Sequence, residues 1–457
     1  MESTWLAMFL LGFSMLGGGG WSEGCLEEER VALSRLKPFF PFIDYYTTEV
    51  GVPRLDDYYE GEDYDSVKEK ESPLVDCCKW ERVECNPTTG RLTHLFLNLP
   101  YTDYDSYDYE YNTKSWYLNA SLFLPFEELQ FLSLSENGIA GCVADQGFEK
   151  LSSRLNKLEI LDLSSNYFND SILASISELS SLKSLSLRDN QFTLVNPTNG
   201  IKMLSKLNNL ETLNLSQNSL GNTILSQLHD LTSLKSLNLQ NCGLEGYVNL
   251  LEFDTLKNLK ELYLDSNEME GIESSFQEKG QLRLNKLEVL SLAGNQFTND
   301  IFSTLAALPN LKSLNLGGNN LKGPLNMKDL NAFSNLEELL LWDNQVTELV
   351  PSQELRLMNL EVLDLIGNPL DTSILATLGR LSNLKTLSFG VNVLNGSIDI
   401  TEMGGLSNLE TLYMDCYSGC SLPLQSFGLF PSLKTLYLSG FSFNETTAAS
   451  HFQNSKL

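Results

Sequence analysis

Apolar and polar positions follow one repeated pattern along most of this chain, LxxLxLxxNxL, in which x is variable and often polar. Successive copies begin 24 to 29 residues apart. The LxL core of each copy alternates sides, which predicts a short strand with one buried face, followed by a return in helical or irregular turns. The thirteen copies begin at Leu129, Leu158, Leu182, Leu210, Leu234, Leu259, Leu287, Leu311, Leu336, Leu360, Leu384, Leu409 and Leu433.

This spacing is the signature of the leucine-rich repeat, whose coils cannot bury their leucines alone and therefore stack on one another. Strands on one side of the stack pair at about 4.8 Å, whereas helical segments on the other side need roughly 8–10 Å. The stack must bend. We expect an α/β solenoid in the shape of a horseshoe, with a parallel β-sheet on its concave side and about thirteen repeats over residues 129–457.

The recurrent Asn of the pattern is expected at the point where the chain leaves each strand. Its side-chain amide satisfies backbone groups of the next coil that would otherwise be buried without a partner. We therefore interpret these asparagines as structural. At Cys242 a thiol takes the place of the Asn, which the repeat pattern allows.

The N-terminus resembles a secretory signal. Trp5 to Leu16 is apolar except for Gly12 and Ser14, and four glycines follow. We assign residues 1–24 to a signal peptide that is too short to span a bilayer. A buried or frayed N-terminal strand is the alternative.

Secretion is favoured independently by five N-glycosylation sequons. Together with paired cysteines they indicate an oxidising route and an extracellular or cell-surface location. Each sequon has a non-proline residue and then Ser or Thr after its asparagine; the acceptors are Asn119, Asn169, Asn214, Asn395 and Asn444.

Eight cysteines are unevenly distributed, and the four that precede the repeats are the most informative: Cys25, Cys77, Cys78 and Cys85. Adjacent cysteines are poorly placed to bond each other, and the sequence alone leaves three pairings open. Zinc binding is the weaker alternative, because the doublet lacks the usual two-residue gap and no His clusters with it. The sequence does not predict the pairing of Cys142, Cys242, Cys416 and Cys420.

The formal net charge is −28, and the excess acid is local. Asp44 to Glu71 contains ten acids and three bases. Asp103 to Glu110 alternates four acids with tyrosines, in a connector that we place at residues 101–128. No basic stripe is present to displace counterions, so nucleic acid is excluded as a partner. Calcium binding lacks its loop motif. Tyrosine sulfation is weighed against a disordered acidic insertion, which we favour.

Residues 25–100 are expected to close the first coil as a cap that includes the acidic insertion. A helix is predicted from Cys25 to Leu36, with Leu26, Leu33, Leu36 and Phe40 on its buried face. Three acids occupy its favourable first turn, and Pro38 ends it.

The segments CLEEERVALSRLK, DCCKWERVEC and TGRLTHLFL resemble the N-terminal cap of plant leucine-rich repeat receptor-like proteins, which lack a kinase. Residues 116–142 and 168–187 resemble the same family. The resemblance implies cell-surface perception of extracellular signals in defence or development, with a receptor kinase as partner. It also implies disulfides that join Cys25 to Cys77 and Cys78 to Cys85.

The chain departs from the family pattern at its end. It shows no cysteine-bearing C-terminal cap and no membrane span, and Tyr417 and Phe441 replace the repeat Asn in the last two copies. We interpret it as an N-terminal portion or a truncated member.

Between the leucines of each strand, side chains are expected to point onto the concave sheet, the usual binding surface of such folds. These positions are small and polar in the early repeats and become aromatic, apolar and acidic from the sixth repeat. Trp342 is the strongest single candidate. The predicted ligand surface comprises Tyr263, Asp265, Leu340, Trp342, Asp343, Asp364, Ile366, Tyr413, Asp415 and Tyr437.

An enzymatic function is disfavoured, because the three histidines lie near no serine or cysteine constellation and no phosphate-binding loop is present. No cofactor is expected. We predict an extracellular recognition module that binds a peptide, protein or glycan and signals only through partners. The alternative is a secreted inhibitor of an extracellular enzyme or a soluble decoy.

Overall fold

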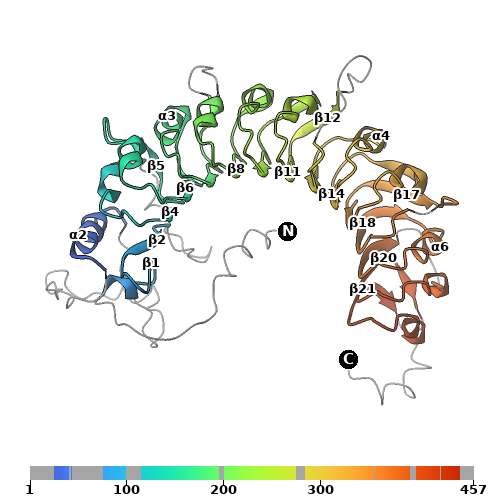
Figure 1. Ribbon diagram of the computed structural model, residues 1–457. Coiled ribbons are helices and arrows are strands. Elements are labelled where there is room, and N and C mark those ends of the chain that lie inside the picture. Colours follow the sequence, from blue (N-terminus) through green and yellow to red (C-terminus); the bar gives the residue numbers. More distant parts are fainter. Residues whose placement is uncertain are drawn as a thin grey trace, which may run out of the picture.

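The computed structural model describes residues 25–40, 43, 76–98, 115–194, 200–273, 284–354, 356–391, 398–422 and 424–442. Stacked coils form an arch, with a long sheet along its inner side and short helices along its outer side (Figure 1). The predicted signal peptide, the acidic stretch 44–71, the tyrosine-rich stretch 103–110, Asn395 and Asn444 lie outside the described residues.

One sheet of fifteen strands lines the inner side of the arch across the described chain. β1 (Val83–Cys85) pairs antiparallel with β2 (Leu92–Phe96), and all later neighbours pair in parallel. Each of the thirteen repeats supplies one strand, which confirms the predicted horseshoe and its concave parallel sheet. These strands are β4 (Phe131–Ser133), β6 (Ile160–Asp162), β7 (Ser184–Ser186), β8 (Thr212–Asn214), β9 (Ser236–Asn238), β11 (Glu261–Tyr263), β13 (Val289–Ser291), β14 (Ser313–Asn315), β16 (Glu338–Leu340), β18 (Val362–Leu370), β19 (Thr386–Val391), β20 (Thr411–Ser421) and β21 (Thr435–Ser442).

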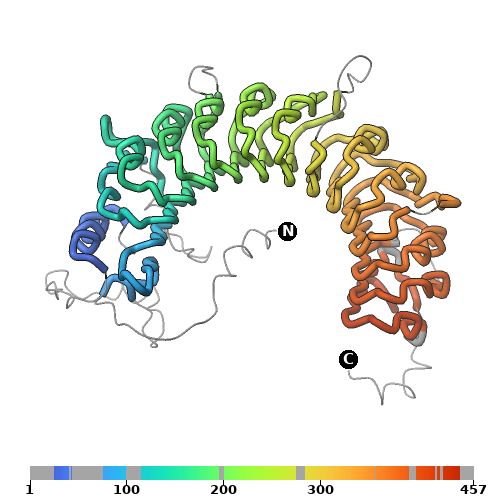
Figure 2. The backbone as a smooth tube through the Cα atoms, in the orientation of Figure 1, coloured from blue at the N-terminus to red at the C-terminus, as the bar shows by residue number. Residues whose placement is uncertain are grey.

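The repeat leucines form one continuous interior along the stack. Leu161, Leu185 and Leu213 occupy the same place on consecutive strands, pair in register and are fully buried. Each coil packs mainly on its neighbours, as the tube through the backbone shows (Figure 2). Stability is therefore distributed along the stack as coil and interface terms.

Short helices and three small parallel sheets complete the coils outside the main sheet. The small sheets pair β3 (Trp116–Leu118) with β5 (Ile139–Cys142), β10 (Glu245–Val248) with β12 (Glu268–Ile272), and β15 (Lys322–Asn326) with β17 (Gln345–Val350). The helices of the repeats are α3 (Leu173–Ile176), α4 (Ile301–Leu305), α5 (Met327–Leu330) and α6 (Ile374–Leu378). Short 3₁₀-helices take this place in most other coils of the described chain.

Two exposed tyrosines on the small sheets lie across glycines of the next coil. Tyr117 pairs with Gly141 and Tyr247 with Gly271, and each ring lies over the α-carbon of its partner glycine. The rings remain 60% and 63% exposed. A side chain at either glycine would displace the ring, so both pairs depend on the missing Cβ.

The repeat asparagines bond backward along the stack. Asn166 donates from Nδ2 to the carbonyls of Leu134, Leu163 and Ser164 at 2.9, 3.1 and 3.0 Å. Its Oδ1 accepts the backbone N–H groups of Asn137 and Ile139 at 3.2 and 2.9 Å. The prediction that the amide serves the next coil was therefore wrong in direction. The contacts across coils reach the preceding coil, because the Asn lies where its own coil leaves the strand.

Cys242 replaces part of this pattern. Its thiol donates to the Leu215 carbonyl at 3.2 Å, which keeps the link to the preceding coil. A thiol offers no good acceptor to the N–H of Leu220, and that N–H is bonded instead by the Cys242 backbone carbonyl at 3.0 Å. The coil thus satisfies its backbone without an amide side chain.

The cap packs helix α2 (Glu27–Leu36) on the first strands of the sheet. Leu33, Leu36 and Phe40 are buried as predicted, but Leu26 is 41% exposed. The prediction for Leu26 was wrong because it precedes the helix as an extended residue. Disulfides join Cys25 to Cys77 and Cys78 to Cys85, which is the pairing that the resemblance implies.

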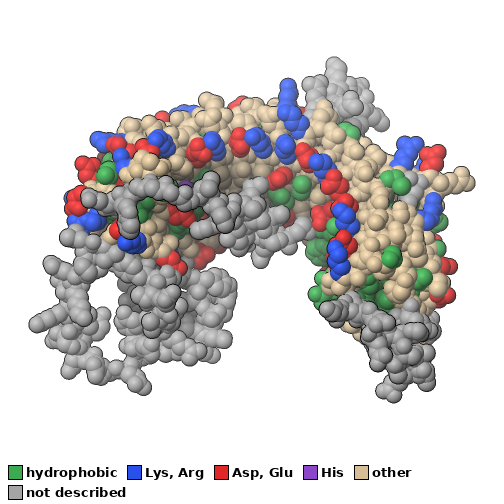
Figure 3. Space-filling view, turned by 60° about the horizontal axis from the view of Figure 1, so that its bottom comes forward, with side chains coloured by type: hydrophobic (Ala, Val, Ile, Leu, Met, Phe, Trp, Pro, Cys, Tyr) green, Lys and Arg blue, Asp and Glu red, His purple; other side chains and the backbone are tan. Residues whose placement is uncertain are grey.

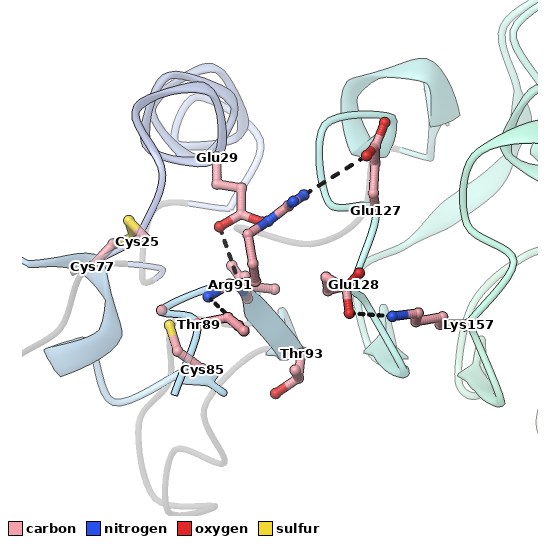
Figure 4. Close-up of polar contacts among 12 residues, drawn as sticks. Cys25, Glu29, Cys77, Cys85, Thr89, Arg91, Thr93, Glu127, Glu128 and Lys157 are labelled. Carbon is pink, nitrogen blue, oxygen red and sulfur yellow. Dashed lines mark hydrogen bonds and ion pairs between the residues drawn. A yellow bond between two sulfur atoms is a disulfide. The ribbon is translucent and has the colours of Figure 1, made fainter. Parts of the chain in front are cut away.

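A buried carboxylate, which the sequence analysis placed only in the first helical turn, fixes the cap helix to the sheet (Figure 4). Glu29 is fully buried; its Oε1 accepts from Arg91 Nε at 2.9 Å and its Oε2 from the Leu92 backbone N–H at 3.2 Å. The Glu29 hydrogen bond raises the pKa of Arg91 further above its usual range. One of the three first-turn acids therefore serves the packing of the cap.

Candidate functional site

The residues between the two leucine positions of each LxL core form one aligned row along the inner face, in the register of the sheet. The early part of the row is small or polar, and the later part contains the predicted Tyr263, Leu340, Asp364, Tyr413 and Tyr437. The row runs Ser133, Asp162, Ser186, Asn214, Asn238, Tyr263, Ser291, Asn315, Leu340, Asp364, Ser388, Tyr413 and Tyr437.

Trp342 lies just after β16 and turns its indole toward the preceding coil. The ring covers the α-carbon of Gly317, the residue at the equivalent place in that coil, and its edge reaches Gly318. A Cβ at Gly317 would overlap the indole, so the glycine allows the ring to lie flat against the inner face. Trp342 is half-buried as a result.

Two acids lie near Trp342 in the chain and in the sheet: Asp343 follows it directly, and Asp364 is on the next strand of the row. Asp364 is half-buried on the inner face, and its Oδ1 accepts the Ile366 backbone N–H at 3.0 Å. Burial, and next the charge of Asp343, raises the pKa of Asp364. Asp343 adopts a left-handed backbone with φ 48° and is exposed, next to Gly367 of the following coil.

Tyr263 and Asp265 occupy the inner face three strands earlier. The Tyr263 hydroxyl lies 3.5 Å from Glu261 Oε2, and burial with the neighbouring acids Glu261, Asp265 and Glu338 raises the pKa of this phenol. Asp265 Oδ1 accepts from Ser291 Oγ and, at 2.9 Å, from the Ala293 N–H. Burial raises the pKa of Asp265 despite these hydrogen bonds.

Two predicted surface residues are less accessible than the sequence suggested. Leu340 is 5% exposed and Asp265 is 9% exposed, so neither offers a free side chain to a large partner. Leu340 lies in the row among bulky neighbours, and Asp265 bonds across to the next coil. The pattern of alternation gives the direction of a side chain but not how much its neighbours cover it.

The last two aromatic residues of the row stack on each other. The rings of Tyr413 and Tyr437 lie 4.3 Å apart at 5° between their planes. Tyr437 is 53% exposed, and Asp415 follows on the same strand as Tyr413. Ile366 follows Asp364 of the row, lies beside Trp342 and is half-buried.

A rim of alternating charges, which the sequence analysis missed, runs along one edge of the inner face (Figure 3). Each member immediately precedes a strand, and its sign tends to change from coil to coil, which is visible in the printed sequence. The ion pairs are Glu159–Lys183 at 2.8 Å, Glu211–Lys235 at 2.7 Å, Lys260–Glu288 at 3.4 Å, Lys312–Glu288 at 2.9 Å, Glu361–Lys385 at 2.7 Å and Glu410–Lys434 at 2.8 Å.

A second aromatic group lies at the other end of the sheet. Phe131 stacks on His94 and Phe96 of the cap strand, with ring centroids 5.9 and 4.8 Å away. Phe131 itself is 5% exposed. His94 is half-buried, with Nδ1 3.5 Å from a Glu84 carboxylate oxygen. These rings join the cap to the first repeat.

The remaining cysteines divide into one pair and two thiols. Cys416 is bonded to Cys420, whereas Cys142 and Cys242 are free. Burial raises the pKa of both thiols to about 12, so neither is a ready nucleophile. Within the described ranges no group of three or more His, Cys, Asp or Glu side chains is arranged to hold a metal ion.

Three of the predicted glycan acceptors are in the described chain. Asn119 and Asn169 cap single turns of 3₁₀-helix through their side-chain oxygens. Asn214 lies in the row on the inner face, where its Oδ1 accepts from the Ser216 N–H and hydroxyl at 3.0 and 2.8 Å. Glycosylation at all five sequons stays a prediction.

Comparison with known proteins agrees with the architecture. Leucine Rich Repeat family models match residues 157–179, 209–231 and 359–381, and a related model matches residues 307–324. The crystal structure of an internalin, inlF, from Listeria monocytogenes aligns with a TM-score of 0.52 and 24% identity, over 70% of this chain and 84% of that one. This similarity shows a shared fold. The chain is a leucine-rich repeat protein.

Proteins of similar sequence indicate which kind of leucine-rich repeat protein this chain is. Receptor-like protein 9a of Arabidopsis thaliana is 37% identical over 209 residues, which make up 45% of this chain and 19% of that protein. Receptor-like protein EIX1 of Solanum lycopersicum is 30% identical over 408 residues, 86% of this chain and 37% of that protein. The chain belongs to the plant leucine-rich repeat receptor-like proteins.

The chain spans about a fifth to about two fifths of the length of these relatives. Of the helices in the described segments, none has the length and apolar character to cross a membrane.

Proposed function

We propose that this chain is the extracellular recognition module of a plant receptor-like protein, and that it binds a peptide, protein or glycan on the inner face of its sheet. The observation that carries the proposal is the aligned row of Tyr263, Asp364, Tyr413 and Tyr437 with Trp342 beside it. Aromatic side chains that keep one open face are the usual anchors of protein interfaces.

Two further features support this function. The disulfides of the cap favour an oxidising compartment. Relatives such as Cuscuta receptor 1 of Solanum lycopersicum, which is 31% identical over 68% of this chain, carry the name of receptors. Signal transmission would belong to partners, among them a receptor kinase.

Trp342→Ala tests the proposal. The glycosylated chain is immobilised and exposed to secreted plant and microbial material, and each captured ligand is identified and its Kd measured directly. We expect the variant to weaken binding at least about tenfold, because a flat, half-buried indole is a typical anchor.

Tyr247→Ala is the matched control, because Tyr247 also lies over a glycine of a neighbouring coil but outside the inner face. It should leave Kd unchanged. Equal affinity of the wild type and Trp342→Ala for every captured ligand would refute binding at this face.

A further inference from the structure

Part of the inner face carries acidic side chains at two ends of a shallow floor. We define the Tyr263–Asp364 surface as Glu261 and Tyr263 on one end, and Glu338, Trp342 and Asp364 on the other. Acidic and hydrophobic side chains gather on this inner side, next to the rim of paired charges (Figure 3).

The floor between the two ends is made of small side chains on β13 and β14. Ser291, Ala293 and Asn315 are each less than one-tenth exposed, and Gly317 has no side chain. Tyr263 therefore borders these small side chains on one side, and on the other side the Trp342 indole lies flat over Gly317. An extended chain that crosses the strands fits such a surface better than a bulky globular protrusion.

The acids at the two ends of the surface interact electrostatically. Glu338 accepts a hydrogen bond from Ser313 at 2.5 Å, which turns its carboxylate toward the floor, and its charge is one cause of the raised pKa of Tyr263. The two ends are thus within electrostatic reach of each other.

No described lysine or arginine pairs with these acids. The lysines nearest in sequence, Lys260 and Lys312, are held by Glu288 on the rim. The inner-face positions of strands β11 to β21 contain no Lys or Arg in the described chain. Negative charge on this surface is therefore not neutralised from within, and it repels acidic glycans and acidic peptides.

The distance between the acids at the two ends sets the distance between the basic groups of a ligand that could pair with both. Three strand steps separate β11 from β16 and four separate β11 from β18, about 14 and 19 Å at the usual strand spacing. An extended peptide covers these spans in about four to six residues, at about 3.3 Å per residue.

We propose that the Tyr263–Asp364 surface takes an extended basic segment of a peptide ligand, with two Lys or Arg side chains about four to six residues apart and small or apolar residues between them. The proposal rests on the proposed function, because it assigns the chemistry of a ligand at the same face. The two basic groups bind the acids at each end, and an intervening apolar side chain packs against the Trp342 indole, which also attracts cations.

A displayed library of random linear peptides of about twelve residues tests this assignment, since that length covers the surface with margin at both ends. The library is selected on the immobilised glycosylated chain at about 0.15 M salt. We expect enrichment of peptides with paired basic residues at the stated spacing. Selected peptides are then synthesised, and their Kd is measured against three variants.

The double variant Glu338→Gln, Asp364→Asn keeps both hydrogen-bond acceptors and removes both charges. It should weaken binding at least about tenfold and flatten the dependence of Kd on salt. Asp162→Asn is the matched control, because Asp162 lies in the same row and its Oδ1 accepts the N–H two residues later at 3.0 Å, as Asp364 does. It should change Kd less than about twofold, since it lies outside the surface. Trp342→Ala should weaken binding as well.

Selected peptides that are neutral or acidic, equal affinity for the double variant, or no enrichment would each overturn the assignment. The outcome is separable from that of the proposed function. Capture of an acidic or neutral secreted ligand through Trp342 would refute the basic segment and leave the recognition function standing. Basic peptides that bind this surface, without any secreted ligand, would support the assignment and count against the recognition function.

Discussion

At the scale of single residues, Glu29 shows how one carboxylate joins parts of the chain that are distant in sequence. It connects the cap helix to Arg91 and to the backbone of β2, 62 and 63 residues later. Arg91 also lies 4.0 Å from Glu127, two residues before the first repeat, so the contact continues toward the solenoid (Figure 4). A buried charge is tolerated here because it is both paired and hydrogen-bonded.

We expect Glu29→Ala to lower the free energy of unfolding of the cap by about 3–5 kcal/mol, because it leaves Arg91 and the Leu92 N–H without their partner. Urea unfolding followed by the fluorescence of Trp80 measures the change. Glu27→Ala is the control, since Glu27 is exposed and pairs only with Arg30 on the same helix. A loss of similar size in both variants would contradict a special role for Glu29.

At the scale of the element, the backbone hydrogen bonds of each coil are completed by the coil that follows it. Each repeat asparagine that the structure describes bonds backbone groups of the coil before it, and Cys242 shows that a thiol can take its place. The thiol keeps one donor contact, and the backbone carbonyl of the same residue takes the N–H groups that an amide would otherwise accept.

Asn166→Ala should therefore cost more than Cys242→Ala. The first change leaves the buried N–H groups of Asn137 and Ile139 without an acceptor and should lower the free energy of unfolding by about 2–4 kcal/mol. The second change removes one weak donor and should lower it by about 1 kcal/mol. Urea denaturation compares the two, and hydrogen exchange at the Ile139 amide locates the effect. Equal destabilisation would show that the side-chain amide contributes no more than the thiol.

The leucine spacing predicted these elements well because each strand is encoded within a few residues of its own coil. The inner-face positions of Tyr263 and Asp364 followed from simple alternation. The flat indole of Trp342 did not, because it depends on Gly317 in another coil. The same holds for the role of Glu29, which is decided by packing between segments, whereas the exposure of Leu26 depends on where the helix begins. The rim charges were readable in the sequence at one fixed place before each strand.

At the scale of the whole molecule, the rim ties neighbouring coils by charge. Most pairs there are half-exposed, and each contributes little alone. As a series they leave the rim locally neutral in a chain with a net charge of −28. The acids of the inner face therefore stand next to an edge that does not compensate them.

Glu288→Lys tests the rim, because Glu288 pairs with both Lys260 and Lys312. The variant sets four lysines on consecutive coils, at positions 235, 260, 288 and 312, and should lower Tm at low salt, with recovery at about 1 M salt, where the Debye length is about 3 Å. Glu270→Lys makes the same charge change at an exposed residue of β12 and should lower Tm less. Identical thermal shifts in the two variants would mean that total charge, not the rim, is responsible.

Because the asparagine bonds reach the preceding coil, they affect how this protein folds during its synthesis. A coil that leaves the ribosome cannot finish its own polar interior until the asparagine of the following coil has emerged, roughly one repeat later. Folding should therefore proceed from the N-terminus, one coil behind synthesis, and should begin at the disulfide-bonded cap.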